Sequence, residues 1–340
     1  MRQLIRFETL KLTLPSGRIF GWALASLLIL AITGEIVLRI ESVQSLLLPP
    51  SYGSSSVEFG IKLAKINSFV KQEGGVDCIF IGSSITDADV DPDVFRAAYK
   101  QYAQRDIACF NFSLAGLPPS SARMVAKYLV QTYQPKTIVY GVSAGEFLKI
   151  FNQRETYSTS WLYYSLGVFS LEGWLYANSY VYRYVPTLRY FYESDYRTLA
   201  DAFSKRISSS GFDRSTVIAQ IAIESPVSRD DYQMDAESFS GYRELVDLNS
   251  VSTRIVIVES PVHPSYFPHY VKGGKEMYES LFIEPISGYA RSRGVPVWRT
   301  QSVLDAALPP QGWSDPTHLN VEGAKVFSEW LAKQYASLTP

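Results

Sequence analysis

The segment Asp77-Cys-Ile-Phe-Ile-Gly-Ser-Ser-Ile-Thr86 combines an apolar run with two serines. A short apolar run bounded by turn-forming residues is typical of a strand buried on both faces of a sheet. Two polar residues, Ser83 and Ser84, follow the run at once. A strand of this kind, ending in small polar residues, indicates the carboxyl edge of a parallel sheet, where ligands bind.

The same pattern of a short buried strand followed by an amphipathic helix recurs along the chain. This alternation predicts an α/β fold: a three-layer α/β/α, flavodoxin-like parallel sheet whose strands all end at one edge. The further strands are predicted at 106–112, 136–142, 253–259 and 295–299. The helices are predicted at 57–70, 92–102, 120–133, 274–293 and 321–335.

Composition sets the broad class of the protein. The chain has 340 residues, of which 46% are hydrophobic and 19% charged, with a formal net charge of −1. These values suit one large domain with attachments, or two small domains. The chain has no basic surplus, so nucleic acid is not expected as a partner.

The strand–helix alternation breaks at about 151–250, which we interpret as an insertion. Aromatic residues crowd 157–191. Because this segment leaves from the active-edge end of the third strand, we expect it to form a lid or wall. A glycan platform, a surface lying on a membrane, and a helical insertion packed on the sheet are the alternatives.

The N-terminal part predicts a membrane anchor. Residues 19–38 are apolar apart from Glu35 and a few small polar residues, which matches the roughly 20 residues that span a bilayer, and we predict the anchor at 19–40. The positive-inside rule then makes 1–18 cytoplasmic and places the domain at 57–340 outside, behind a tether at 41–56. A cleaved signal peptide is the alternative to this single-pass signal anchor. The basic residues before the apolar run are Arg2, Arg6, Lys11 and Arg18.

The chain has two cysteines, Cys78 and Cys109, each in a predicted buried strand. Two cysteines make neither a disulfide framework nor a metal site. Buried free thiols are the expectation, and a cross-strand disulfide is the alternative.

The carboxyl ends of the predicted strands gather a set of reactive side chains. Ser84 follows the first strand, Gly116 the second and Ser143 the third, while Asp315 and His318 follow the fifth. A serine hydroxyl needs a base to take its proton, and a histidine oriented by a carboxylate is such a base. The set therefore predicts acyl-transfer chemistry at this edge.

Three blocks of the sequence resemble those of the SGNH, or GDSL-type, hydrolase superfamily. Gly82-Ser-Ser84 matches its Gly-Asp-Ser block, with Ser83 at the position of the usual Asp. Asn111-Phe-Ser-Leu-Ala-Gly116 matches its second block, and Asp315-Pro-Thr-His318 its Asp-x-x-His block. The family's third-strand Asn is replaced by Ser143. The blocks occur in the family's order.

The resemblance implies a role for each matched residue. Ser84 is expected to be the nucleophile, His318 its base and Asp315 the partner of that base. The oxyanion hole is expected from the backbone N–H groups of Ser84 and Gly116 and, in place of the family Asn, from the hydroxyl of Ser143.

Further residues are expected near this edge. Ser83, Asn111 and His263 are possible substrate contacts, although Ser83 can also cap the next helix. His263 and His269 lie in a proline-rich loop that can serve as a rigid connection only. Glu146 is interpreted as a solvated loop charge, with a substrate contact as the alternative. No metal site is predicted, and no cofactor is implied.

The anchor narrows the expected resemblance to membrane-anchored, extracytoplasmic SGNH-like proteins of the cell envelope. That group includes the D-alanyl transfer protein of teichoic acid modification and acetyltransferase-type proteins of exopolysaccharide systems. The resemblance implies an esterase or O-acyltransferase active in polysaccharide modification. Its expected partners are the membrane, an acylated carbohydrate or envelope polymer, and a membrane acyl-transfer protein.

Two other functions remain open from the sequence. The fold can serve as a catalytically weak binding or assembly module of an envelope polysaccharide system, since Ser143 replaces the family Asn. Alternatively, Gly141-Val-Ser-Ala-Gly145 reads as the Gly-x-Ser-x-Gly elbow of α/β-hydrolases, with Ser143 as the nucleophile.

Overall fold

The computed structural model describes most of the chain. The described residues are 17–44, 46–54, 56–149, 157–188, 194–214, 232–263, 265, 273–300 and 308–338.

Within these ranges, five parallel strands form one sheet in the order β2-β1-β3-β4-β5. This is a doubly wound, flavodoxin-like order, in which successive strands are added to one side of β1 and then, from β3 onward, to its other side. The finding confirms the predicted fold class and places the carboxyl ends of β1 and β3 side by side. The strands are β1 (Cys78–Ile81), β2 (Cys109–Asn111), β3 (Thr137–Val142), β4 (Arg254–Glu259) and β5 (Val297–Trp298).

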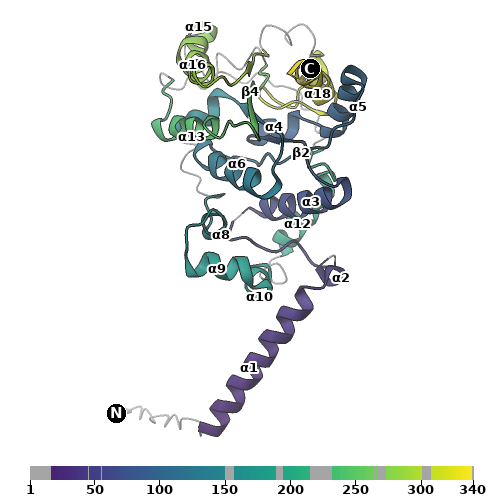
Figure 1. Ribbon diagram of the computed structural model, residues 1–340, viewed down its shortest axis with the longest axis vertical. Coiled ribbons are helices and arrows are strands. Elements are labelled where there is room, and N and C mark those ends of the chain that lie inside the picture. The colour runs from purple at the N-terminus through teal and green to yellow at the C-terminus, as the bar shows by residue number, and fades with distance from the viewer. Residues whose placement is uncertain are drawn as a thin grey trace, which may run out of the picture.

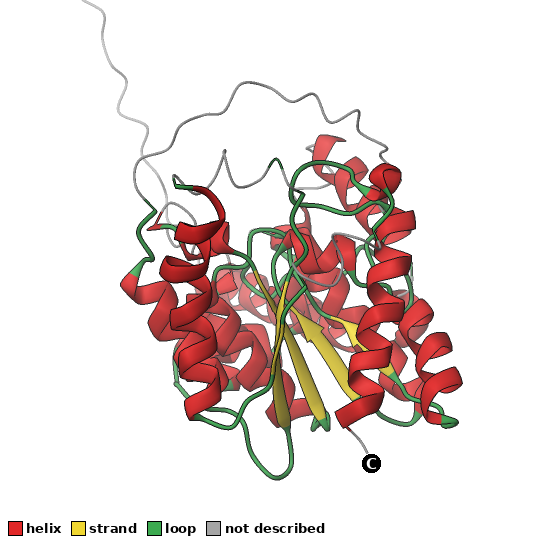
Figure 2. Ribbon diagram, turned by 90° about the horizontal axis from the view of Figure 1, so that it is seen from above, coloured by secondary structure: helices red, strands yellow, loops and turns green. Residues whose placement is uncertain are grey.

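Helices cover both faces of the sheet (Figure 2). Alternate residues of β1 enter two different cores. Ile79 and Ile81 pack with α3, α6, α13 and α16, whereas Cys78 and Phe80 pack with α5 and α18. The flanking helices are α3 (Val57–Glu73), α5 (Pro92–Ala103), α6 (Pro119–Tyr133), α13 (Ala236–Val246), α16 (Glu284–Ser292) and α18 (Val321–Leu338).

Local signals fix the ends of these helices as predicted. α3 stops at Gly74, whose φ of 77° is left-handed. α5 begins after Asp91, which caps the N–H groups of Asp93 and Val94, with Pro92 at the first helical position. The helix predicted at 274–293 is divided into α15 (Gly274–Tyr278), a π-helical turn η4 (Glu279–Ile283) and α16.

A short helix that the sequence did not predict follows β1 directly. α4 runs from Ser84 to Asp89, and the Ser83 hydroxyl caps it by accepting from the N–H of Ile85 at 3.3 Å. α4 lies very close to the strand ends, because a Cβ at Gly82 or Gly141 would lie 2.1 Å from Oγ1 of Thr86.

The N-terminal helix α1 (Gly17–Leu38), within the range predicted as the anchor, projects from the domain and is followed by α2 (Glu41–Gln44) (Figure 1). By length and composition, α1 is able to cross a membrane. The segment predicted as a tether packs against the body of the protein, since Tyr52 contacts the ring of Trp161 at a centroid distance of 4.6 Å.

The described part of the predicted insertion is helical. Its helix α8 packs against α6, and α12 packs against α3. α13, which falls inside the range predicted as insertion, instead packs against α6 and covers the sheet. The elements after β3 are η1 (Ala144–Phe147), α8 (Ser160–Ser165), α9 (Leu171–Asn178), α10 (Tyr180–Tyr184), η3 (Pro186–Leu188) and α12 (Ser194–Arg206).

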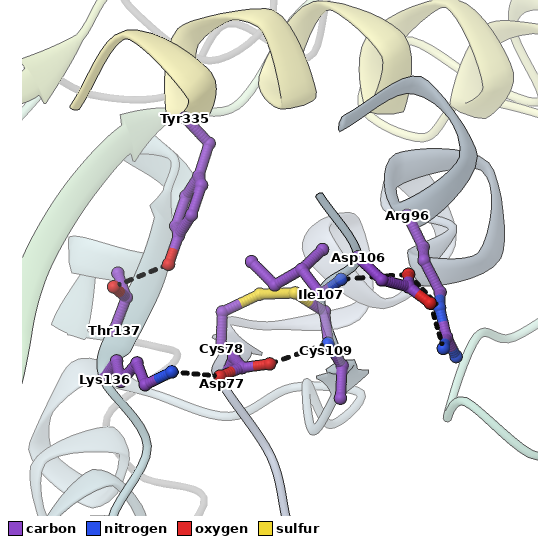
Figure 3. The surroundings of a disulfide bond; sticks show 10 residues. Asp77, Cys78, Arg96, Asp106, Ile107, Cys109, Lys136, Thr137 and Tyr335 are labelled. Carbon is purple, nitrogen blue, oxygen red and sulfur yellow. Dashed lines mark hydrogen bonds and ion pairs between the residues drawn. A yellow bond between two sulfur atoms is a disulfide. The ribbon is translucent and has the colours of Figure 1, made fainter. Parts of the chain in front are cut away.

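Cys78 and Cys109 form a disulfide, so the expectation of free thiols is wrong (Figure 3). The two residues are direct partners in the register of β1 and β2, with Cα atoms 4.6 Å apart. Side chains at paired positions of neighbouring strands point to the same face, which brings the sulfurs within bonding distance. The sequence located both strands but did not give this register.

Candidate active site

Ser84 lies at the carboxyl end of β1, where it begins α4. Its Oγ is 2.9 Å from Nε2 of His318, although 234 positions separate the two residues. Both side chains are partly exposed. The fold therefore brings the Ser84 hydroxyl and the His318 imidazole, which are far apart in the sequence, into direct contact at an accessible position.

Asp315 holds the other side of the imidazole. Its Oδ2 lies 2.7 Å from Nδ1 of His318. Its Oδ1 accepts hydrogen bonds from the backbone N–H groups of Thr317 (2.7 Å) and His318 (2.8 Å) and from the Thr317 hydroxyl (2.9 Å). This compact turn fixes the carboxylate, and the carboxylate in turn orients the histidine.

These contacts decide the charge of Asp315. Partial burial raises the pKa of its carboxyl group, but the hydrogen bond and charge of His318 and the hydrogen bonds from Thr317 outweigh burial and lower that pKa to about 2. Asp315 is therefore ionised at neutral pH and is able to stabilise an imidazolium.

Asp89, at the end of α4, binds the loop that contains Asp315, His318 and Leu319, which we call the histidine loop. This contact joins the loop to the helix that carries Ser84. Its Oδ1 accepts from the backbone N–H of Leu319 at 2.7 Å. The Asp89 side chain is fully buried, and burial raises the pKa of its carboxyl group well above its ordinary value. The two ends of α4 thus contact two consecutive residues of the loop, His318 and Leu319, which fixes the distance between Ser84 and the imidazole.

Glu146, on η1 after β3, lies on the other side of the serine pair. Only 3% of the residue is exposed, so its interpretation as a solvated loop charge is wrong. Its Oε1 accepts hydrogen bonds from the hydroxyls of Ser83 and, at 3.3 Å, Ser143. The sequence missed this contact because β1 and β3 are neighbours only in the folded sheet.

Burial sets the protonation of Glu146. It raises the pKa of this carboxyl group to about 7, although the hydrogen bonds from Ser83 and Ser143 favour the ionised form. Its second oxygen, Oε2, is buried without a hydrogen-bond partner among the described residues. Glu146 is therefore poised between its neutral and ionised forms at neutral pH.

The contacts of Glu146 bear on two predicted site residues. Ser83 is buried and is used as a helix cap and as a donor to Glu146, which does not fit a substrate contact. Ser143 is 1% exposed, and its hydroxyl donates to the same carboxylate. This hydrogen bond directs the Ser143 hydroxyl to Glu146, while its expected role in the oxyanion hole stays a prediction.

The turn after β2 carries Gly116, whose φ of 71° requires the left-handed region that favours glycine. Asn111, at the end of β2, is fully buried. Its amide donates to backbone carbonyl groups of α4 and of Val90, and its oxygen accepts from the N–H of Ser113. Asn111 thus binds the end of α4 to this turn, and the structure does not expose it to a substrate.

A buried ionic cluster lies beneath the Gly116 turn. Lys62 of α3 is completely buried and donates to Asp87 of α4 and to the backbone oxygens of Asn111 and Gly211. Glu58, one turn earlier on α3, accepts from the N–H of Ala115 at 3.0 Å. The cluster therefore braces both α4 and the residue that precedes Gly116.

The position of Lys62 in the sequence is a signal for this buried cluster. Lys62 shares the helix face of Phe59, Ile66 and Phe69, and a charge in an apolar stripe indicates a buried ion pair. Burial raises the pKa values of Glu58 and Asp87, which are both close to Lys62.

His263 follows β4 and lies beside the histidine loop. Its backbone N–H donates to the backbone oxygen of Pro316 at 3.0 Å. Its ring packs edge to face against Trp313, with the ring centroids 5.4 Å apart. Its Nδ1 is 2.8 Å from the hydroxyl of Ser265. These contacts support the loop, and partial burial lowers the pKa of His263. The expectation for His269 lies outside the described residues.

Together these residues define a class of site. In a Ser–His–Asp row at the carboxyl edge of a doubly wound sheet, the histidine is placed to accept the proton of the serine hydroxyl while the carboxylate orients its ring. The rival α/β-hydrolase reading needs the base beside Ser143, but the structure places His318 beside Ser84.

No protein-family profile and no curated protein sequence matches this chain. Among solved structures, the fold is similar to the psychrotrophic esterase EstA from Pseudoalteromonas sp., with 12% identity, a TM-score of 0.39, and coverage of 78% of this chain and 100% of that chain. It is also similar to the lipase/acylhydrolase from Enterococcus faecalis, with 8% identity, a TM-score of 0.40, and coverage of 77% and 97%. Sequence identities and TM-scores this low assign neither a family nor an activity to this chain.

Proposed function

We propose that this protein is an SGNH-type, serine-dependent ester hydrolase or O-acyltransferase. One observation carries the proposal: Nε2 of His318 lies 2.9 Å from Oγ of Ser84, while Nδ1 lies 2.7 Å from the Asp315 carboxylate. These distances are within the hydrogen-bond reach that proton transfer to a base requires.

In the first step, Ser84 Oγ attacks the carbonyl carbon of the ester and His318 takes its proton. Asp315 stabilises the resulting imidazolium. The negative charge on the carbonyl oxygen is expected to be held by the backbone N–H groups of Ser84 and Gly116. The ester C–O bond then breaks, and the leaving alcohol takes the proton from His318.

In the second step, His318 removes a proton from the acceptor hydroxyl, which attacks the acyl-serine. Collapse of this second tetrahedral intermediate returns the proton to Ser84 and releases the acyl group on the acceptor. Water as acceptor gives hydrolysis, and a sugar or polyol hydroxyl gives O-acyl transfer. Which of these occurs depends on the acceptor that the site admits.

Two observations support a location outside the cytoplasm. α1 is long and apolar enough for a membrane anchor, with basic residues on its N-terminal side. The Cys78–Cys109 disulfide is typical of proteins that fold in an oxidising compartment. On this basis we infer that the domain acts at the outer face of the membrane.

A catalytic domain held at that face meets envelope and exported polymers. We therefore propose an acylated envelope glycan as donor or acceptor, and a membrane acyl-transfer protein as a partner that supplies acyl groups when the reaction is a transfer.

The test is labelling of the full-length protein, in detergent, with a fluorophosphonate probe. We expect the wild type to be labelled, Ser84→Ala to be unlabelled and His318→Ala to be labelled much more slowly. Ser143→Ala is the matched control and should keep its labelling. Loss of labelling in Ser143→Ala, with labelling retained in Ser84→Ala, would refute the proposal.

The hydrogen bond from Ser143 to Glu146 favours a second candidate function. It leaves the oxyanion hole without the side-chain donor that the family resemblance implies, which suits a binding or assembly module of low activity. A folded wild-type protein that resists the probe, but binds an acylated glycan, would favour this candidate.

A further inference from the structure

The turn between α8 and α9, together with the first turn of α9, exposes four large apolar side chains. Val168, Phe169, Leu171 and Trp174 are 57%, 74%, 67% and 42% exposed. We call these four residues the α9 apolar face. They lie within seven positions of the chain, and a concentrated apolar patch of this kind marks a surface that binds something.

Packing on the opposite side of α9 fixes the direction of this face. Gly173 and Tyr176 are buried against the domain. A Cβ at Gly173 would lie 2.3 Å from the backbone oxygen of Ser160, so α9 and α8 are in very close contact. Because Leu171 and Trp174 are three residues apart, they share the outer side of the helix and remain exposed.

The anchor binds the same part of the domain through Glu35, a charged residue inside the apolar helix α1. Its carboxylate accepts from the Ser179 hydroxyl at 3.0 Å and from the N–H groups of Tyr180 (2.9 Å) and Val181 (3.1 Å). Arg39 donates to the same carboxylate at 2.8 Å. These four bonds account for a charge that a lone membrane helix would not tolerate.

Two further contacts join α1 to the end of α9. Arg39 also donates to the backbone oxygen of Asn178, the last residue of α9, at 3.0 Å. Gly34 allows α10 to approach closely, because a Cβ there would lie 3.2 Å from Cγ2 of Val181. The junction thus fixes α9 and α10 relative to the anchor.

The position of this junction along α1 gives its depth. Glu35 lies three residues before Leu38, the last residue of α1, which is about 5 Å of helix. α9 and α10 therefore lie beside the outer end of the span, as Figure 1 shows, while α5 and α18 lie at the far end of the domain. Exposed Ile40 and Leu46 flank the anchor just after α1.

We propose that the α9 apolar face lies in the outer interfacial layer of the bilayer that α1 spans. The surface is a lipid-docking site, and its occupant is the headgroup and upper acyl region of phospholipid. This inference rests on the membrane location proposed above. It adds that the domain is held on the bilayer by two attachments, α1 and α9, with its orientation fixed by Glu35.

The chemistry of the patch suits lipid. Trp and Tyr concentrate at membrane–water interfaces, where an apolar ring meets a polar layer. Trp174 and Tyr180 lie on either side of the Asn178 contact with the anchor. Glu172, the charged residue of α9, accepts a hydrogen bond from Ser160 at 2.6 Å and so is held toward α8. An interfacial helix of this kind inserts roughly 5–10 Å.

The experiment uses the full-length protein reconstituted in phosphatidylcholine–phosphatidylglycerol vesicles, with the fluorophore NBD on one introduced cysteine. The two native cysteines are paired and do not react. Phe169→Cys is the test position and Leu30→Cys, within α1, is the positive control. Tyr102→Cys is the matched control, since this exposed aromatic lies on α5, far from α1.

We expect lipids with a nitroxide at acyl carbon 5 to quench NBD at position 169 at least threefold more than at position 102. Equal, weak quenching at positions 169 and 102, with strong quenching at position 30, would overturn the proposal. So would a blue-shifted NBD emission at position 169 without nitroxide quenching, which would indicate a protein partner. Absence of quenching at position 30 would refute the membrane location itself.

A second variant tests the junction. Glu35→Leu keeps α1 apolar but removes the acceptor for Ser179, Tyr180 and Val181, and we expect quenching at position 169 to fall by half or more. Unchanged quenching would show that Glu35 does not fix the orientation. Fluorophosphonate labelling of Ser84 in the same vesicles reports the catalytic proposal separately, so either proposal is able to fail alone.

Discussion

Two carboxylates flank the Ser83–Ser84 pair, and their environments set them apart. Asp315 is half-exposed, contacts His318 and has its pKa lowered to about 2. Glu146 is buried, accepts hydrogen bonds from the hydroxyls of Ser83 and Ser143, and has its pKa raised to about 7. At neutral pH, Asp315 is therefore ionised, whereas Glu146 is present in both its neutral and its ionised form.

The difference shows how the site separates catalysis from positioning. In the proposed mechanism, Asp315 supplies negative charge where the imidazolium forms, because the hydrogen bond and charge of His318 and the hydrogen bonds from Thr317 keep its carboxyl group ionised. Glu146 lacks a cationic partner in the described structure, and burial makes its charge costly. We therefore expect Glu146 to act through Ser83, by holding the turn that presents Ser84.

The strongest test of this comparison is to neutralise each carboxylate in turn. Asp315→Asn should lower kcat/KM by about 10³–10⁴-fold, since an amide cannot stabilise the imidazolium and favours the wrong tautomer. Glu146→Gln should lower it by less than about tenfold, because the amide oxygen still accepts from Ser83. Ester hydrolysis with a chromogenic acetate ester measures both, and equal losses would contradict the assigned roles.

The pKa of Glu146 predicts a pH dependence of stability. Its folded pKa of about 7 exceeds the ordinary value of 4.5 expected in the unfolded chain. Between these values the folded state binds more protons, so the free energy of unfolding falls as pH rises. The loss from this group should be about 2–3 kcal/mol between pH 5 and 8.

Urea unfolding of the full chain in detergent at both pH values measures this effect. Glu146→Gln removes the titrating group, so its loss of stability with pH should be smaller than that of the wild type by about this amount. Glu322→Gln, an exposed carboxylate on α18, is the matched control and should behave as the wild type. Identical pH slopes in all three proteins would show that Glu146 does not titrate in this range.

A smaller effect is expected from Thr317, which supports Asp315. Thr317→Val removes the hydroxyl that donates to Oδ1 of Asp315 and lies 3.1 Å from Nδ1 of His318. The backbone bonds of the turn remain. A hydrogen bond to a charged group contributes about 1.5–3 kcal/mol. Part of this stabilisation acts on the transition state through Asp315, so kcat should fall roughly 5- to 20-fold with little change in KM. A change in KM alone would place Thr317 at the substrate.

The sequence predicted the pairing of Asp315 with His318, because this contact depends on residues that are close together in the chain. Asp315 and His318 are three apart, and their contact is formed within one turn. The approach of Ser84 followed from the alternating strands and helices, because parallel strands end at a common edge. Periodicity fixed the helices well, as at α3 and α5, whose caps are local.

The contacts of Glu146 depend on which strands are neighbours in the sheet, and this cannot be read from residues that are close together in the chain. Its contact with Ser83 requires β1 and β3 to be neighbours, and a loop carboxylate with no nearby partner reads as solvated. The same limit applies to Cys78 and Cys109, whose bond follows from strand register. α4 was missed because its six residues are too short to show helical periodicity.

The last prediction concerns Ser143, which touches Glu146 but not His318. Ser143→Ala removes a hydrogen bond of 3.3 Å that favours the ionised carboxylate, so the pKa of Glu146 should rise further. The stability change is expected to stay below about 1 kcal/mol, and kcat/KM to stay within about threefold of the wild type. Retained activity, together with a stability loss displaced to higher pH, would tie Ser143 to Glu146. A collapse of activity would instead make Ser143 an oxyanion donor or the nucleophile itself, and Glu146 would then belong to the catalytic machinery.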